Sequence, residues 1–374
     1  MRFHVALAAS LVLLTLLPSA EAAAPLLVVG REGQPRTAVC TPGGITKIIE
    51  IFSVHLPAGE TELVGWGPDL PAKVDTLTLT PAGARVVRWR EEPTLGGRAW
   101  TVAADAAGDY QMAIFYDLPQ LTTKLSYRLD WEDGHGSLRV FLRLTNGLPQ
   151  PLALAGAEYA MAGAAGALGP AAFRTHGALV LPPGVERVEE VAVLADLAGE
   201  RVYEYDGGAV HERLELALTP AQLATWGALA PGDLSVADPV TAERLPLAVG
   251  PLPGPAQGKV AIALRDTADV VVRRTLVREA KTVVDFDTLR QVTGSDLTEE
   301  YRLEVRNYTP EAITVRLWEM TTAAWELTSP TPVARTEGNR LAYEVRPQAG
   351  DTSLMELTVV KHSGTRAQAV AVRP

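Results

Sequence analysis

The stretch Tyr301–Glu319, YRLEVRNYTPEAITVRLWE, decides the fold of this chain. Successive side chains of a strand point to opposite faces, so a half-buried strand alternates between apolar and polar residues. The first segment places Leu303 and Val305 on one face, and the same alternation resumes after the turn-forming residues 307–310. The pattern predicts a hairpin with one face against a core and the other, which carries Arg316, in water.

Similar short alternating or β-branched runs fill the rest of the chain, separated by 27 Pro and 32 Gly. Such punctuation favours many short strands over long helices. Thr219-Pro220 offers an N-cap followed by Pro at the first helical position, which predicts one short helix. We therefore expect a mainly β protein with two or more β-sandwich-like domains, little helix, and an immunoglobulin-like sandwich at the C-terminus. The expected parts are a signal peptide (1–22), an N-terminal β domain (23–120), a central β-rich domain with the short helix (121–250) and a C-terminal β-sandwich (251–374).

The N-terminus carries the features of a secretory signal peptide. Arg2 precedes an apolar run from Val5 to Leu17, and Ala20-Glu21-Ala22 is a small-residue cleavage pattern. The apolar run is too short for a good membrane span. We expect cleavage near Ala22, export to the periplasm or the cell exterior, and no transmembrane segment in the mature chain.

The composition of the chain argues against several classes of function. The chain has 34 basic and 44 acidic residues, a net charge of −10, without the basic clusters that nucleic acids or anionic membranes require. Cys40 is the only cysteine, which rules out an intrachain disulfide and favours a buried thiol over an intermolecular disulfide or a metal ligand. No zinc, calcium, nucleophile-elbow or phosphate-loop motif occurs, so we expect neither a cofactor nor a metal.

Several turn and core motifs resemble those of the bacterial family called domain of unknown function 4139. The matching residues are Leu56-Pro57-Ala58-Gly59-Glu60-Thr61-Glu62-Leu63, Leu125-Ser126-Tyr127-Arg128-Leu129, Leu142-Arg143-Leu144-Thr145-Asn146, Ala160-Met161-Ala162-Gly163, Tyr301-Arg302-Leu303-Glu304-Val305-Arg306-Asn307, Val315, Trp325-Glu326-Leu327, Pro330, Tyr343-Glu344-Val345, Ala349-Gly350 and Leu357-Thr358-Val359. The resemblance implies β-sandwich architecture and export, and it supplies no catalytic residues. The long coiled coil of some relatives is absent from this sequence.

Two patterns remain as candidate sites. Asp285-Phe286-Asp287 places two carboxylates on one face of a strand, at a spacing between those of retaining and inverting glycosidases. A solvated strand end explains the same pattern. Trp318 lies on the Arg316 face, where it could stack on a sugar or anchor a partner, or could be buried by packing between domains.

Taken together, the residues favour an exported, non-catalytic scaffold or binding protein of the cell envelope, with an envelope protein or a glycan as its partner. No catalytic residue is assigned, and Trp318 is the one candidate binding residue. Two alternatives stay open: a carbohydrate-active hydrolase that uses the Asp285 and Asp287 carboxylates, and a sugar- or peptide-binding module that uses Trp318 or an unpaired strand edge.

Overall fold

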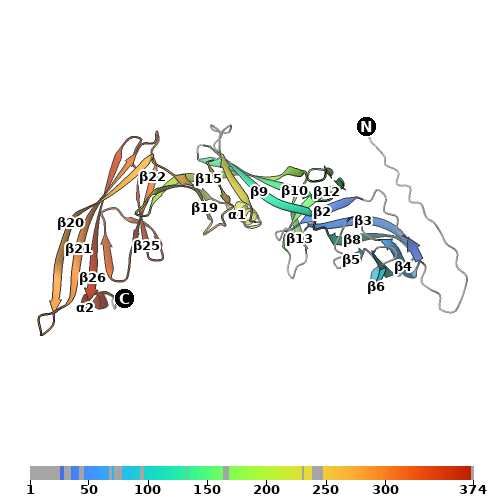
Figure 1. The fold of residues 1–374 in the computed structure, drawn as a ribbon, viewed down its shortest axis with the longest axis horizontal. Helices are drawn as coiled ribbons and strands as arrows, with labels where there is room; N and C mark the ends of the chain where they lie inside the picture. Colours follow the sequence, from blue (N-terminus) through green and yellow to red (C-terminus); the bar gives the residue numbers. More distant parts are fainter. Residues whose placement is uncertain are drawn as a thin grey trace, which may run out of the picture. The chain divides into compact units, whose positions relative to one another are not determined.

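Strands make up most of the protein in the computed structural model, which describes residues 26–28, 35–41, 46–66, 70, 78–92, 97–132, 134–162, 168–229, 231–237 and 247–371. Two short helices accompany the strands (Figure 1). The predicted mainly β class with several sheets is confirmed. The signal peptide predicted for residues 1–22 lies outside the described residues. No helix in the described part of the chain has the length and apolarity to cross a membrane.

The described residues form two units, each of which takes several separate stretches of the chain. The first takes mainly the residues up to Ser126 and Arg139–Val193, and the second takes Tyr127–Leu138, Leu194–Leu229 and the residues from Asp233 onward.

The first unit contains a four-stranded sheet in the order β1-β4-β7-β6, a six-stranded sheet in the order β13-β12-β2-β3-β8-β5, and the pair β11-β14. The strands are β1 (Leu26–Val28), β2 (Arg36–Cys40), β3 (Thr46–Leu56), β4 (Gly59–Trp66), β5 (Thr78–Pro81), β6 (Arg85–Glu92), β7 (Gly97–Ala104), β8 (Gly108–Asp117), β11 (Leu152–Leu154), β12 (Gly156–Ala162), β13 (Leu168–Arg174) and β14 (Leu179–Leu181). Cys40, at the end of β2, is fully buried and its thiol is free, as predicted.

Three long strands contribute residues to both units: β9 (Leu121–Glu132), β10 (His135–Asn146) and β15 (Glu186–Tyr205). β9 and β10, which flank Asp133-Gly134, are neighbours in a sheet, and Asp-Gly between two alternating runs is a strong hairpin signal. Gly134 in their connection has a φ of 83°, a conformation that favours glycine.

The second unit packs two sheets around one core. Its other elements are β16 (Val210–Ala217), α1 (Pro220–Gly227), β17 (Asp233–Ala237), β18 (Ala248–Pro251), β19 (Lys259–Asp266), β20 (Val270–Phe286), β21 (Val292–Asn307), β22 (Thr314–Met320), β23 (Trp325–Thr328), β24 (Val333–Glu337), β25 (Arg340–Val345), β26 (Thr352–Gly364) and α2 (Thr365–Ala371). One sheet has the order β20-β21-β26-β23, and β15, β22, β25 and β24 are consecutive strands of the other. Their inner faces meet in a buried cluster that includes Leu303, Val305, Val315, Leu317 and Tyr343.

Helix α1 forms where the sequence predicts it. The Thr219 side chain accepts a hydrogen bond from the Gln222 backbone, and the Gln222 side chain accepts one from the Thr219 backbone. This capping box, with Pro220 in the first turn, satisfies backbone donors that the start of a helix leaves open.

The predicted hairpin at 301–319 is wrong. β21 pairs with β20 and β26, whereas β22 pairs in parallel with β15 and in antiparallel with β25, so the two segments belong to different sheets. The intervening residues carry the chain from one layer of the sandwich to the other. A corner of this kind and a hairpin turn use the same residue types, and the local sequence did not separate them.

Asn307 holds this corner in place. The residue is fully buried; its Nδ2 donates hydrogen bonds to the carbonyl oxygens of Glu311 (2.6 Å), Gln348 (3.0 Å) and Pro347 (3.3 Å). Its Oδ1 accepts hydrogen bonds from the backbone N and the hydroxyl of Thr309. One amide side chain therefore satisfies polar backbone groups from two loops, where an unpaired group would be costly.

The first unit contains a second corner with the same hydrogen bonds. Asn146 ends β10 and is also fully buried. Its Nδ2 donates to the carbonyl oxygens of Gln150 (2.9 Å) and Leu181 (2.8 Å), and its Oδ1 accepts from the backbone N of Leu148. In both corners the amide bonds the backbone two and four residues ahead, and Pro follows at the third position. Each unit thus contains one corner of this type, although no fixed-period repeat is visible in the sequence.

Candidate functional site

Trp318, the candidate binding residue, is buried. It lies on β22 and is 7% exposed, and the Arg340 guanidinium carbon lies 4.5 Å from the centre of its ring. The indole nitrogen has no hydrogen-bond partner among the described residues. A ring that stacks on a sugar needs an exposed face. Trp318 offers little such surface, and its binding role stays a prediction.

The two candidate carboxylates engage different groups. Asp287 Oδ1 accepts hydrogen bonds from the backbone N of Leu289 and of Gln291, both at 2.8 Å, which shapes the turn after β20. Asp285 Oδ2 accepts a 3.3 Å hydrogen bond from the Thr365 hydroxyl at the start of α2. The Asp287 contacts are those of a turn, whereas the Asp285 contact joins the end of β20 to α2. A hydrolytic role for the pair stays a prediction.

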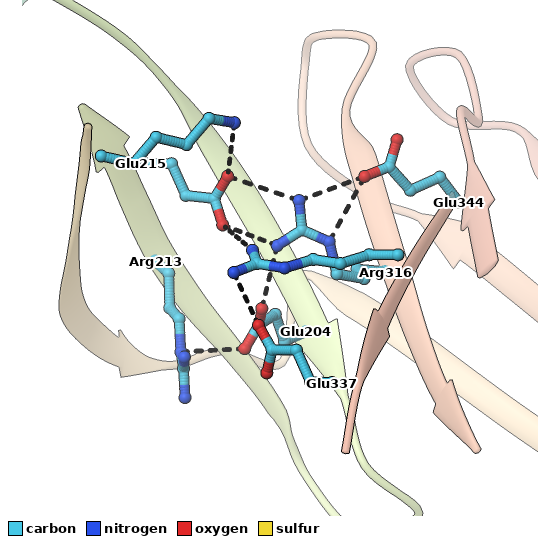
Figure 2. A network of polar contacts seen from close by, with 8 residues as sticks. Glu204, Arg213, Glu215, Arg316, Glu337 and Glu344 are labelled. Atoms are coloured by element: carbon cyan, nitrogen blue, oxygen red, sulfur yellow. Dashed lines mark hydrogen bonds and ion pairs between the residues drawn. The ribbon is translucent and has the colours of Figure 1, made fainter. Parts of the chain in front are cut away.

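A buried network of charges occupies the β22 face that was expected to be in water (Figure 2). Arg316 lies at its centre and is only 4% exposed, so the prediction that this side chain faces solvent is wrong. The guanidinium donates to three carboxylates: Glu215 at 2.7 Å, Glu204 at 3.0 Å and Glu344 at 3.1 Å. Strand pairing explains two of these contacts, because Arg316 lies opposite Glu204 on β15 and opposite Glu344 on β25.

Further bases at the rim complete the network. Arg213 lies 3.0 Å from Glu204, while Arg335 and Lys259 lie 3.5 Å and 3.8 Å from Glu215. Arg335 also pairs with Glu337 at 2.6 Å. The eight side chains are four bases and four acids, so their formal charges cancel.

The network holds its groups in the charged state. Burial alone raises the pKa of the Glu215 carboxyl, but the hydrogen bond and charge of Arg316, helped by Lys259 and Arg335, outweigh it and hold that pKa below its usual value. Burial lowers the pKa of Arg316, and its hydrogen bonds to Glu215, Glu344 and Glu204 more than reverse this and raise it. Groups fixed in this way are poor proton donors or acceptors near neutral pH. The network is therefore suited to joining strands rather than to acid–base catalysis.

A second polar cluster joins helix α2 to the long hairpin β20–β21. Asp296 Oδ1 accepts hydrogen bonds from Arg366 Nε (2.6 Å) and His362 Nδ1 (2.7 Å). These bonds, that of Arg366 above all, hold the pKa of the Asp296 carboxyl below its usual value. The His362 side chain is buried, and its Nε2 lies 3.5 Å from Glu326 Oε1, too far for a good hydrogen bond. In the described part of the chain no group of three or more His, Cys, Asp or Glu residues could hold a metal ion.

The hairpin β20–β21 exposes an unusual amount of apolar surface. Seven of the nineteen exposed large hydrophobic side chains in the described residues fall between 270 and 292. Phe286 (61% exposed) and Leu289 (76%) lie at the turn that Asp287 shapes, and Val292 begins the return strand. Single exposed hydrophobic residues are normal, but concentrated apolar surface often marks an interaction site.

β20 is also the edge strand of its sheet. Figure 1 shows it beside β21, and it ends the strand order β20-β21-β26-β23. β20 has seventeen residues, whereas β23 at the opposite edge has four. An edge strand presents unpaired backbone groups, and proteins usually keep such edges short or cover them. The hairpin and its edge form the candidate interaction surface, hereafter the hairpin surface, defined as residues 270–292.

Comparison with known proteins adds no assignment to this site: no family model matches the chain, and no curated protein matches it. The resemblance to domain of unknown function 4139 is thus still a prediction. The sequence contained one signal of the hairpin surface, a run of apolar and basic residues in β20. Because these residues also fit an ordinary half-buried strand, the exposure could not be read from the pattern.

Proposed function

We propose that this chain is an exported, non-catalytic binding or scaffold protein of the cell envelope, and that its second unit binds a partner protein through the hairpin surface. The concentration of exposed apolar side chains at 270–292 carries the proposal. In the sandwich core of this unit the apolar side chains are buried, and the charges of the Arg316 network are paired. Export is supported by the signal-peptide pattern at residues 1–22.

The proposal favours a protein over a glycan. Sugar recognition commonly uses exposed aromatic rings, and Trp318 is buried. The hairpin surface has one exposed aromatic ring, that of Phe286, and otherwise combines aliphatic side chains with a long open strand edge, a combination that suits a polypeptide partner. Asp285 and Asp287 contribute to the shape of the hairpin end in this view.

Site-specific photo-crosslinking tests the binding role. A photoreactive residue is placed at Leu289 in one variant and at Val249, which is similarly exposed (70% against 76%) but outside the hairpin surface, in a matched control. Both are expressed with the native N-terminus, and the mature N-terminus and cell fraction are determined. We expect cleavage near residue 22 and one crosslinked envelope protein from Leu289 that excess unlabelled chain removes. Equal, non-competable crosslinking from both positions would contradict the binding site, and a retained N-terminus would contradict export.

A further inference from the structure

We infer that the proximal half of β20, Val270–Leu276, binds an extended acidic segment of a partner protein, which adds as a further strand to the sheet. This inference rests on the proposed binding function and gives the chemistry of the partner. It is carried by three observations: the direction of the backbone groups of β20, the continuity of its pairing, and its charge.

Backbone hydrogen bonds give the direction of the N–H and C=O groups of β20. The backbone N of Tyr308 donates to the carbonyl oxygen of Asp269, two residues that lie opposite each other in the β20–β21 register. In an antiparallel pair, hydrogen-bonded and non-hydrogen-bonded residue pairs alternate. Odd-numbered residues of β20 up to the first bulge therefore bond to β21. The N–H and C=O groups of Val272, Arg274 and Leu276 point to the open edge, which no strand of the described residues covers.

This part of the edge is regular enough to serve as a template. The register between β20 and β21 is continuous from Val270 to Leu276, opposite Asn307 to Tyr301. The first irregularity lies between Leu276 and Arg278, and two more follow before Phe286. Bulges twist an edge and discourage pairing, so the distal half of β20 is protected while the proximal half is not.

The charge of the proximal half selects an acidic partner. Arg273 and Arg274 are its only charged residues. Arg274 lies 3.2 Å from Glu319 and stacks on the Tyr301 ring, so its charge is matched within the unit. Arg273 points to the opposite face. Glu304 lies opposite it in the β20–β21 register, but the two side chains form no ion pair. A carboxylate on an added strand beside Arg273 would supply an ion-pair partner on the open side of β20.

Side-chain alternation along β20 indicates which sequence pattern the partner segment should have. On the outer face of β20, Arg273 lies between Val271, which is exposed, and Thr275. An added strand would place every second side chain beside these residues. The favoured segment carries an acidic residue beside Arg273 and a β-branched residue beside Val271. A second copy of this chain fits less well, because antiparallel pairing centred on Arg273 places two like charges together.

A peptide titration tests the inference with the full mature chain. The probe is a short fluorescent peptide that alternates valine with glutamate, and the control probe has lysine in place of glutamate. Fluorescence anisotropy should show saturable binding of the glutamate peptide only. Arg273→Glu should weaken this binding by about tenfold, the effect of one charged hydrogen-bonded contact, and should favour the lysine peptide instead.

A proline variant separates strand addition from side-chain contact. The Leu276 N–H points to the open edge, so Leu276→Pro removes an outward donor without breaking the β20–β21 ladder. The matched control Leu276→Ala loses the side chain alone. We expect the proline variant to bind the glutamate peptide about tenfold more weakly than the alanine variant. Hydrogen exchange should show slower exchange of the Val272, Arg274 and Leu276 amides in the wild-type complex.

Each outcome is decisive. No saturable binding, equal affinity of the proline and alanine variants, or unchanged exchange of the three amides would overturn the inference. A dimer of the wild-type chain that Leu276→Pro abolishes, without peptide binding, would assign the edge to a second copy and also overturn it. Specific crosslinking from Leu289 together with failure of the peptide titration would retain the binding function and reject only the acidic strand.

Discussion

Replacement of Arg316 by Met should destabilise the second unit strongly. The substitution keeps much of the side-chain volume but removes the central charge from the network. Glu204 and Glu215 would stay buried, with only the partly exposed bases Arg213, Arg335 and Lys259 near them. Removal of one partner from a buried ion pair costs about 3–5 kcal/mol, because the other charge is left uncompensated. That is a large part of the roughly 5–15 kcal/mol that stabilises a typical domain.

The loss of stability in the Arg316→Met variant should depend on pH in a definite direction. In the wild-type protein the folded-state pKa of Glu215 is lowered, so its contribution to stability is present above its unfolded pKa of about 4.3 and is lost as the pH falls through the folded value. Without Arg316, burial dominates and raises the folded pKa of Glu215. The free-energy difference between wild type and variant should therefore be largest near pH 7 and smaller near pH 4.

Hydrogen exchange of β22 and β25 measured by mass spectrometry reports the local free energy of opening. The matched control is Arg278→Met, since the Arg278 side chain is 67% exposed and lies 3.5 Å from Glu300. An exposed pair of this kind contributes about 0–1 kcal/mol. Equal effects of the two substitutions at pH 7, or an Arg316→Met effect that grows toward pH 4, would refute the account of the network.

Three further predictions concern other buried polar groups. Asn307→Asp replaces the NH2 group, which donates to three carbonyl oxygens, by a buried acceptor facing them and should cost about 2–4 kcal/mol in urea unfolding. Asn339→Asp in an exposed turn should change little, and similar effects of the two substitutions would contradict the corner role. Cys40 should resist thiol reagents at pH 8 until the chain unfolds. Burial raises the pKa of its thiol to about 12, and a hydrogen bond with Thr123 opposes this only in part. Rapid labelling of the folded protein would disprove this prediction. Asp296→Asn should speed amide exchange in α2 at pH 7. Because the folded pKa of Asp296 is lowered, its contribution to stability is fully present above the unfolded value of about 3.9 and is lost as the pH falls through the folded value, where wild type and variant should converge; a constant difference would rule out this linkage.

Alternation predicted which residues share a face, and the structure bears this out along β21. Leu303 and Val305 are buried, whereas Arg302 and Arg306 are exposed. Helix α1 was also predicted, because an N-cap residue followed by Pro acts over a few residues. Local chemistry was sufficient wherever the deciding interactions are themselves local.

The errors arose where distant segments decide the outcome. Arg316 was expected in water because its strand alternates, but alternation does not say what covers a face. Its carboxylate partner Glu204 is 112 residues away in sequence, on a strand that pairs with β22 in parallel. The prediction of a hairpin at 301–319 was wrong for a related reason, since Asn307 donates hydrogen bonds to carbonyl groups about forty residues downstream, near Pro347. Neither contact has a signature in a single sequence.

The Arg316 network and the hairpin surface lie in the same unit, and their physical roles complement each other. The network fixes β15, β22 and β25 together through charges that are fully paired. The sandwich core joins that layer to β21 and β26, and β21 in turn holds β20 along its whole length. An edge held in this way keeps its outward groups in one conformation before a partner arrives. Because ordering of a binding surface opposes association, an edge ordered in advance loses less free energy when a strand is added. Rigidity built from buried charge thus favours recognition at an exposed edge, even though no charged group of the network touches that edge.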